Sequence, residues 1–170
     1  MKQVYFVGGT MGVGKTTTAK ALKTRLHNSV LLDGDWCWDM NPFIVNGETK
    51  QMVIENICFV LNNFIKCTVF ENIIFCWVMH EQAIVDEIVS RLDVENCTLH
   101  MVSLISTKQA LQSRWHNDIV AGTRTEDGIY RSIQRLPLYE KLDTIKVDVS
   151  EISAEEAAEY IIANCQEMKM

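Results

Sequence analysis

The stretch GGTMGVGKTT, from Gly8 to Thr17, decides how the rest of the chain is interpreted. From Gly9 onward it has the spacing G-x-x-x-x-G-K-[ST]. It follows the apolar run QVYFVG, which is typical of a buried strand, and it leads into a run of good helix formers. Glycines let the backbone curl so that successive N–H groups point inward, and a helix starting near Lys15 adds its positive end. The stretch therefore predicts a phosphate-binding loop (P-loop).

The P-loop predicts that the chain binds a nucleoside triphosphate together with Mg²⁺. The Lys15 ammonium is expected to reach the β- and γ-phosphates, and the Thr16 hydroxyl is expected to bind Mg²⁺. No N-K-x-D guanine motif is present, so the expected nucleotide is ATP. The residues expected to contact it are Gly9, Met11, Gly12, Val13, Gly14, Lys15, Thr16 and Thr17. The loop alone does not distinguish phosphoryl transfer from hydrolysis or from a nucleotide switch.

Strand-like apolar runs alternate with helical patterns along the chain. Strands are expected at residues 3–8, 29–33, 72–78, 97–105 and 144–149. Helices are expected at residues 15–26, 51–64, 81–92, 106–115, 129–135 and 153–164. Two of these helices are expected to open with capping boxes, Ser106-x-x-Gln109 and Ser153-x-x-Glu156. Such alternation predicts one α/β domain over residues 1–170, with helices on both faces of a parallel sheet and ligands beyond its carboxyl end.

The composition is that of an ordinary globular domain. The 170 residues carry a formal net charge of −6, which argues against general nucleic-acid binding. No apolar run reaches the ~18–20 residues that a membrane span requires. The N-terminus is expected to be a strand and not a signal peptide, and the six cysteines, without C-x-x-C spacing, are expected to be reduced. We therefore expect a cytoplasmic protein, either a monomer or a weak homodimer.

Two carboxylates, Asp33 and Asp35, follow the second expected strand in LLDGDW. The third strand ends in WVMHE without an aspartate, so these two are the best candidates near Mg²⁺. Asp33 is expected in or behind the metal's ligand shell. Asp35 is expected to orient or deprotonate an acceptor hydroxyl. An Asp-Gly turn without function is the alternative, which the position after the P-loop helix disfavours.

The segments VYFVGGTMGVGKTTTAKAL and LLDGDW resemble the small P-loop kinases of the shikimate kinase, gluconate kinase, adenylylsulfate kinase and chloramphenicol phosphotransferase type. The chain is similar to P-loop kinase-like proteins often labelled AAA-family ATPases. The resemblance implies a three-layer P-loop NTPase fold whose five-stranded parallel sheet has the order 2-3-1-4-5. It also implies a short lid at about residues 117–130 and an acceptor-site region at about residues 33–66.

The same resemblance implies ATP- and Mg²⁺-dependent phosphoryl transfer to a small hydroxyl-bearing acceptor. It does not name that acceptor. DGDW lacks the asparagine that follows in adenylylsulfate kinases, and NPF lacks the histidine of gluconate kinases. Two alternatives stay open: a nucleotide-binding ATPase or sensor without transfer chemistry, and a nucleotide or polynucleotide-end kinase, which the acidic charge disfavours.

Arginines in the segment RWHNDIVAGTRTEDGIYRSIQR are candidates for phosphate contacts. Charge on a transferring phosphoryl group needs such a cation. Arg124, in the most loop-like part, is the expected catalytic arginine, and Arg131 and Arg135 are further lid candidates. The resemblance implies that Arg114 packs on adenine. A solvated surface position is an equal alternative for any single one of them.

Candidate acceptor contacts lie mostly in and after LLDGDW. They are Asp33, Asp35, Trp36, Phe43 and His80. Trp38 is a further candidate wall residue, because pockets are mostly apolar with few polar groups. Core packing is an equal alternative for each aromatic side chain, and a helix-start histidine is more often structural than a ligand contact.

Overall fold

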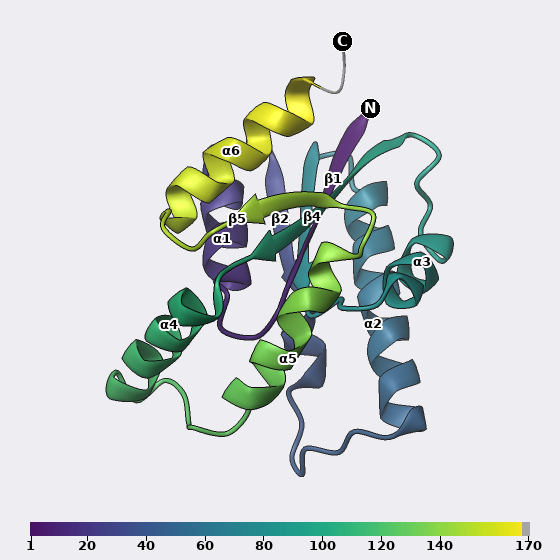
Figure 1. Cartoon of the computed structure of the whole chain (residues 1–170). Helices are drawn as coiled ribbons and strands as arrows, with labels where there is room; N and C mark the ends of the chain where they lie inside the picture. Colours follow the sequence, from purple (N-terminus) through teal and green to yellow (C-terminus); the bar gives the residue numbers. More distant parts are fainter. Residues whose placement is uncertain (168–170) are drawn as a thin grey trace.

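Five parallel strands form the centre of the chain in a computed structural model that describes residues 1–167 (Figure 1). Their order, β2-β3-β1-β4-β5, confirms the predicted sheet. The strands are β1 (Lys2–Gly9), β2 (Ser29–Asp33), β3 (Asn72–Trp77), β4 (Cys97–Ile105) and β5 (Ile145–Asp148). Register is set by pairs such as Tyr5 with Ile74 and with His100. All strands therefore end at the same edge of the sheet.

Six α-helices within the described residues cover the sheet. They are α1 (Lys15–Arg25), α2 (Gly47–Lys66), α3 (Gln82–Ser90), α4 (Lys108–Val120), α5 (Ile129–Glu140) and α6 (Ala154–Glu167). Val4 and Phe6 of β1 pack toward α2 and α3, whereas Tyr5 and Val7 pack toward α1 and α6. Because both faces of β1 are buried, its sequence is continuously apolar. The three-layer prediction is confirmed (Figure 1).

Helix α2 begins at Gly47, four residues earlier than predicted. Asn46 Oδ1 accepts a hydrogen bond from Thr49 N at 2.8 Å, and Thr49 Oγ1 accepts one from Asn46 N at 2.9 Å. This reciprocal pair is a capping box built with threonine in place of the usual Glu or Gln. The apolar stripe that predicted the helix starts only at Ile54, about two turns later, so periodicity alone placed the boundary too late.

The predicted capping box at Ser106 is wrong, because Thr107 is the N-cap of α4 and its Oγ1 accepts from Ala110 N at 3.2 Å. Thr107 N itself donates to Ser150 Oγ at 2.8 Å, a contact set by tertiary structure. The box at Ser153 is confirmed: Glu156 Oε2 accepts from Ser153 N at 2.8 Å, and Ser153 Oγ accepts from Glu156 N at 3.1 Å.

The irregular segment between α4 and α5 is shorter than the predicted lid. Helix α4 continues to Val120 and helix α5 extends through Pro137 to Glu140, so only residues 121–128 lie outside helices. A further helix was not predicted: a 3₁₀ turn, η1 (Gly34–Trp38), follows β2 directly. No helix in the described part of the chain is both long and apolar enough to span a membrane. None of the six cysteines, all of which lie within the described residues, takes part in a disulfide bond.

Candidate active site

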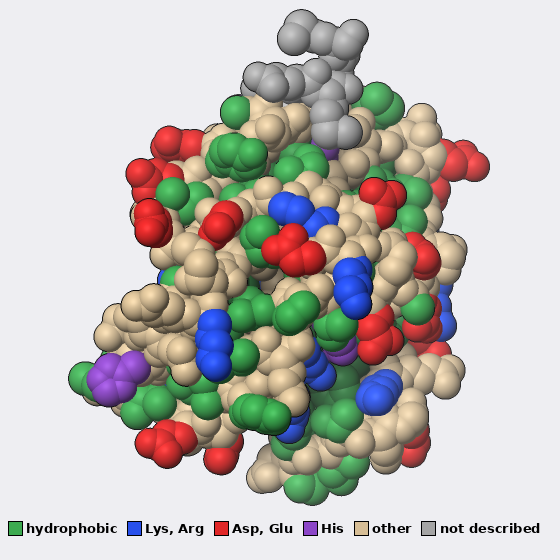
Figure 2. All heavy atoms as spheres, viewed as in Figure 1, with side chains coloured by type: hydrophobic (Ala, Val, Ile, Leu, Met, Phe, Trp, Pro, Cys, Tyr) green, Lys and Arg blue, Asp and Glu red, His purple; other side chains and the backbone are tan. Residues whose placement is uncertain are grey.

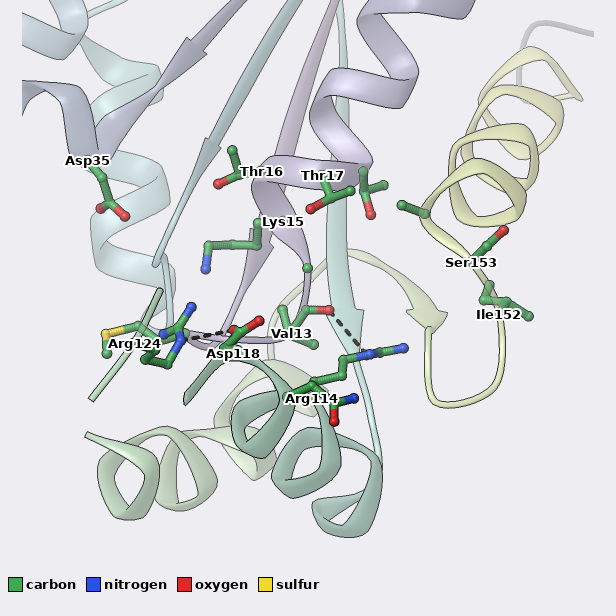
Figure 3. Close-up of a pocket in the computed structure, with 16 residues that line it drawn as sticks. Val13, Lys15, Thr16, Thr17, Asp35, Arg114, Asp118, Arg124, Ile152 and Ser153 are labelled. Atoms are coloured by element: carbon green, nitrogen blue, oxygen red, sulfur yellow. Dashed lines mark hydrogen bonds and ion pairs between the residues drawn. The ribbon is translucent and has the colours of Figure 1, made fainter. Parts of the chain in front are cut away.

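The P-loop curls between β1 and α1 as the sequence predicts. Gly12 and Gly14 have φ of 78° and 106°, a left-handed region that suits glycine. At Gly12 a Cβ atom would also lie 2.8 Å from the ring of Trp115, so this position excludes a side chain twice over. The loop forms the floor of a cleft of about 640 Å³, called here the first cleft (Figure 3). Of the predicted ATP contacts, Met11 to Thr17 line this cleft. Gly9 does not line it and lies beneath the loop, close to Val13 and Lys15.

Lys15 is held beneath the loop that precedes it. The residue is only 8% exposed, and its Nζ donates to the Thr10 carbonyl at 2.9 Å. Burial lowers the pKa of Lys15, while the negative charges of Asp35 and Asp33 oppose that shift. A desolvated cation beside phosphate-binding N–H groups interacts strongly with an anion that enters the cleft. In Figure 3 the Lys15 side chain is directed to the same end of the cleft as Asp35 and Arg124.

Asp33 and Thr16 place oxygen ligands side by side. Thr16 Oγ1 donates to Asp33 Oδ2 at 2.7 Å, and Asp33 Oδ1 accepts from Asp35 N at 3.1 Å. Hydroxyl and carboxylate oxygens fit Mg²⁺, which usually takes few protein ligands and completes its shell with phosphate and water. The described residues contain no cluster of three His, Cys, Asp or Glu side chains that could hold a metal without such help. Asp33 is 5% exposed and lines neither cleft, so its position fits the predicted metal role and not the predicted acceptor contact.

Asp35 lies where the first cleft meets a larger one of about 1120 Å³, called here the second cleft. Among the described residues, only Asp35 and Met11 line both. Burial raises the pKa of the Asp35 carboxyl, and the charge of Asp33 raises it further. Lys15 and a hydrogen bond from Trp77 act in the opposite direction. The carboxylate is therefore a stronger proton acceptor than an ordinary aspartate, and the Trp77 indole N–H favours its ionised form.

Gly34, the residue before Asp35, packs closely against Trp77. A Cβ atom at Gly34 would lie 2.5 Å from Trp77 Cγ. Gly34→Ala must therefore displace either the indole or η1, and we expect it to lower the free energy of unfolding by about 1–3 kcal/mol. Urea unfolding measures this loss. Gly47→Ala is the matched control, because a Cβ there has nothing within 4 Å, and equal stability losses in both variants would contradict the packing argument.

The four predicted arginines separate into different places. Arg114 lines the first cleft, and its guanidinium donates to the carbonyls of Val13 (3.3 Å) and Val149. Arg124 also lines the first cleft. By contrast, Arg135 lines the second cleft, and Arg131 is exposed and lines neither. Arg131 and Arg135 are four residues apart on α5, but neither of them lines the first cleft.

Arg124 is held at the edge of the first cleft by two contacts. Its Nε is 3.1 Å from Asp118 Oδ2 (Figure 3). Its guanidinium lies 4.3 Å above the ring of Trp115. Trp115 in turn donates from Nε1 to the Thr125 carbonyl at 3.0 Å. The buried Trp115 indole therefore contacts both the 121–128 segment and Gly12 of the P-loop. Its role was not visible in the sequence, because Trp115 stands on a helix with no functional motif.

Predicted acceptor residues Trp36, Phe43 and His80 all line the second cleft, together with Trp38. Burial lowers the pKa of His80, and the nearby charge of Arg135 lowers it further. Sequence reasoning missed Trp77, which lines this cleft from the end of β3. Trp77 stands at the carboxyl end of a strand, which was the available signal, but only aspartates were considered at the strand ends.

A buried polar pair ties the P-loop to α5. Thr10 Oγ1 donates to the Ser132 carbonyl at 2.8 Å and lies 2.8 Å from Ser132 Oγ, which also contacts the Met11 carbonyl. Both residues are at most 2% exposed. Buried, satisfied hydrogen bonds of this kind fix one arrangement of a loop. These hydrogen bonds therefore hold helix α5 against the loop that forms the first cleft. The same helix carries Arg135, which lines the second cleft.

The profile of the AAA domain family matches residues 6–124, which is more than half of the chain. The chain belongs to this AAA domain family. No curated protein sequence matches this AAA domain protein. Its matched segment includes the P-loop, Asp33, Asp35 and Arg124, so every residue that lines the first cleft except Ile152, Ser153 and Ala154 falls within the family's shared region.

Solved structures similar to this AAA domain protein include several kinases. A gluconokinase from Sinorhizobium meliloti 1021 has a TM-score of 0.73 at 15% identity, covering 98% of this chain and 93% of the other. The tunicamycin resistance protein of Deinococcus radiodurans has 0.72 at 19%, covering 96% and 95%. Shikimate kinase from Acinetobacter baumannii, in complex with shikimate, has 0.65 at 20%, covering 100% and 96%. The predicted P-loop kinase-like fold is thereby confirmed.

Proposed function

We propose that this AAA domain protein is an ATP- and Mg²⁺-dependent phosphotransferase that acts on a small molecule bearing a hydroxyl group. The observation that carries the proposal is the place of Asp35, a carboxylate between a P-loop cleft and a second cleft of about 1120 Å³. Hydrolysis alone needs only the first cleft and a water molecule. Transfer needs a second binding space and a proton acceptor at the junction, and this chain has both.

The P-loop N–H groups and Lys15 hold the triphosphate of ATP with its γ-phosphorus toward Asp35. Thr16 and Asp33 would hold Mg²⁺, which neutralises charge on the β- and γ-phosphates when it is bound. The acceptor oxygen forms a bond to the γ-phosphorus while the bond from that phosphorus to the β,γ-bridging oxygen breaks and ADP leaves. Asp35 accepts the hydroxyl proton. Arg124 supplies a further cation at the edge of the first cleft.

The raised pKa of Asp35 suits this role. A general base works best when its pKa approaches the working pH. Burial and Asp33 move the Asp35 pKa in that direction, while Trp77 and Lys15 keep the carboxylate form available. The contacts of Thr16 and of the Asp35 backbone with Asp33 hold the proposed metal ligand and the proposed base in one fixed arrangement.

The test compares ADP formation with phosphate release in the presence of Mg-ATP and a panel of alcohols. A phosphotransferase forms more ADP than free phosphate when its acceptor is present, and mass spectrometry finds the phosphorylated alcohol. Equal amounts of ADP and phosphate with every alcohol would instead favour the ATPase or sensor alternative. Preferential phosphorylation of a nucleoside monophosphate or a 5′-hydroxyl oligonucleotide would favour the nucleotide or polynucleotide-end kinase.

A further inference from the structure

The second cleft is walled mainly by aromatic side chains. Trp36, Trp38, Phe43 and Trp77 all line it, and three of the chain's four tryptophans are among them. The rings of Trp38 and Phe43 are 5.8 Å apart between centroids, so they support one another. Trp36 is 58% exposed and Phe43 is 67% exposed. Large aromatic surfaces left open at a cleft are favourable to cover, because burying them removes apolar area from water.

Except for Trp77, these aromatic residues lie on the segment that connects β2 to α2. Figure 2 shows hydrophobic side chains gathered in the hollow between α2 and α5. Ile54 of α2 and Ile84 of α3 add aliphatic walls to the same cleft. At about 1120 Å³ it is larger than the first cleft, at about 640 Å³. A cleft of this size and lining suits a molecule with an apolar body and few polar groups.

The charges of the second cleft disfavour an anionic ligand. Its carboxylates are Asp35, Asp39, Glu81 and Glu87, and its permanent cations are Lys50 and Arg135. Glu87 pairs with Arg91 at 2.7 Å, outside the cleft, which still leaves three carboxylates against two cations. The lowered pKa of His80 keeps its imidazole uncharged near neutral pH. An acidic acceptor would therefore meet more carboxylates than permanent cations along the lining of the second cleft, and like charges repel.

We infer that the second cleft takes a ring-bearing alcohol that is uncharged or carries an amine, and does not take a sugar acid or another anion. This inference rests on the proposed function for the placing of the hydroxyl group. The ring lies among Trp36, Trp38 and Phe43, and the hydroxyl group points to Asp35. An amine, where present, meets the carboxylates and aromatic faces of the cleft.

A matched set of small probes separates the effect of the ring from the effect of charge. The probes are 1-phenylethanol (uncharged), 2-amino-1-phenylethanol (cationic), mandelate (the anionic counterpart) and gluconate (anionic, without a ring). Binding is followed by quenching of tryptophan fluorescence in the presence of Mg-ADP, and turnover is followed separately by ADP formation. We expect the first two probes to bind at least about tenfold more tightly than mandelate, and gluconate to bind weakest.

Phe43→Ala and Phe59→Ala form the matched pair of variants, because both side chains are highly exposed (67% and 70%) but only Phe43 lines the cleft. We expect Phe43→Ala to weaken binding of the ring-bearing probes about tenfold and Phe59→Ala to leave it unchanged. Tighter binding of mandelate or gluconate, no binding of either ring-bearing alcohol at millimolar concentration, or equal effects of the two variants would overturn the inference.

The two proposals fail in different ways. If the ring preference appears in fluorescence but no alcohol raises ADP formation above phosphate release, the cleft's specificity stands and phosphoryl transfer is wrong. If gluconate is phosphorylated in preference to the ring-bearing alcohols, transfer stands and the inferred acceptor class is wrong.

Discussion

Lys15→Met is expected to reduce acceptor phosphorylation by about 10³-fold or more, the largest loss of any single substitution in the chain. The lysine is the cation that stands within the P-loop, and a fixed charge in a water-poor site stabilises developing negative charge strongly. Methionine keeps the length and volume of the stem but cannot neutralise phosphate. Initial rates of ADP formation and titration with a fluorescent ATP analogue measure the loss of turnover and of affinity.

The loss in Lys15→Met should not come from unfolding. Burial lowers the pKa of Lys15, so the folded protein holds this cation at a cost when no phosphate is present. The variant without nucleotide is therefore expected to unfold at no lower temperature than the wild type. Lys20→Met is the matched control, since Lys20 is exposed on the same helix and should leave both rate and affinity unchanged. Normal turnover in Lys15→Met would show that the P-loop assignment is wrong.

Asp35→Asn is expected to reduce acceptor phosphorylation by about 10²–10⁴-fold, the range that a general base contributes. The amide keeps the shape of the side chain but accepts no proton. Release of phosphate from ATP in the absence of an acceptor should change little, because water does not need the second cleft. Asp39→Asn removes a carboxylate that lines the second cleft but not the first, and it should retain most of the activity. Equal losses in both variants would indicate a general charge effect and not a base.

The pH dependence gives Asp35 a second signature. Its pKa lies above the ordinary value of 3.8, so the acidic limb of the rate profile should lie above that value as well. Trp77→Phe removes the indole N–H that favours the carboxylate, and this limb should move to still higher pH. Between the ordinary and the raised pKa, the folded state binds more protons than the unfolded state, so the free energy of unfolding falls as pH rises through that window. The amide introduced by Asp35→Asn cannot titrate, so urea unfolding of this variant should show a smaller decrease.

The first cleft was largely predictable because its determinants are local. Glycines at fixed spacing, Lys15 and Thr16 lie within one strand–loop–helix unit, where the chain's connectivity by itself fixes their geometry. The same holds for LLDGDW, since a strand's carboxyl end reaches the shared edge of a parallel sheet wherever that strand is placed. The alternation of strands and helices then left few topologies open.

Features that depend on segments far apart in the sequence were not predictable in this way. Trp77 contacts Asp35 only because β3 pairs with β2, and Trp115 covers Gly12 only because α4 folds back over the P-loop. Neither contact corresponds to a recognisable motif or residue spacing in the sequence. The N-cap of α4 was misplaced for the same reason, because a hydrogen bond from Thr107 N to Ser150 Oγ fixes this position.

The sequence by itself thus determined the alternation of strands and helices, the phosphate-binding loop and the pair of carboxylates beside it, because each follows from local conformational preference and from chain connectivity; the order of the strands came from the family resemblance. Only the tertiary structure decided which arginine meets which cleft, that Asp33 is buried against Thr16 while Asp35 stands at the junction, and that aromatic side chains wall the second cleft. Those outcomes depend on how separate helices pack on the sheet, and packing is set by the shapes of surfaces that the linear order does not bring together.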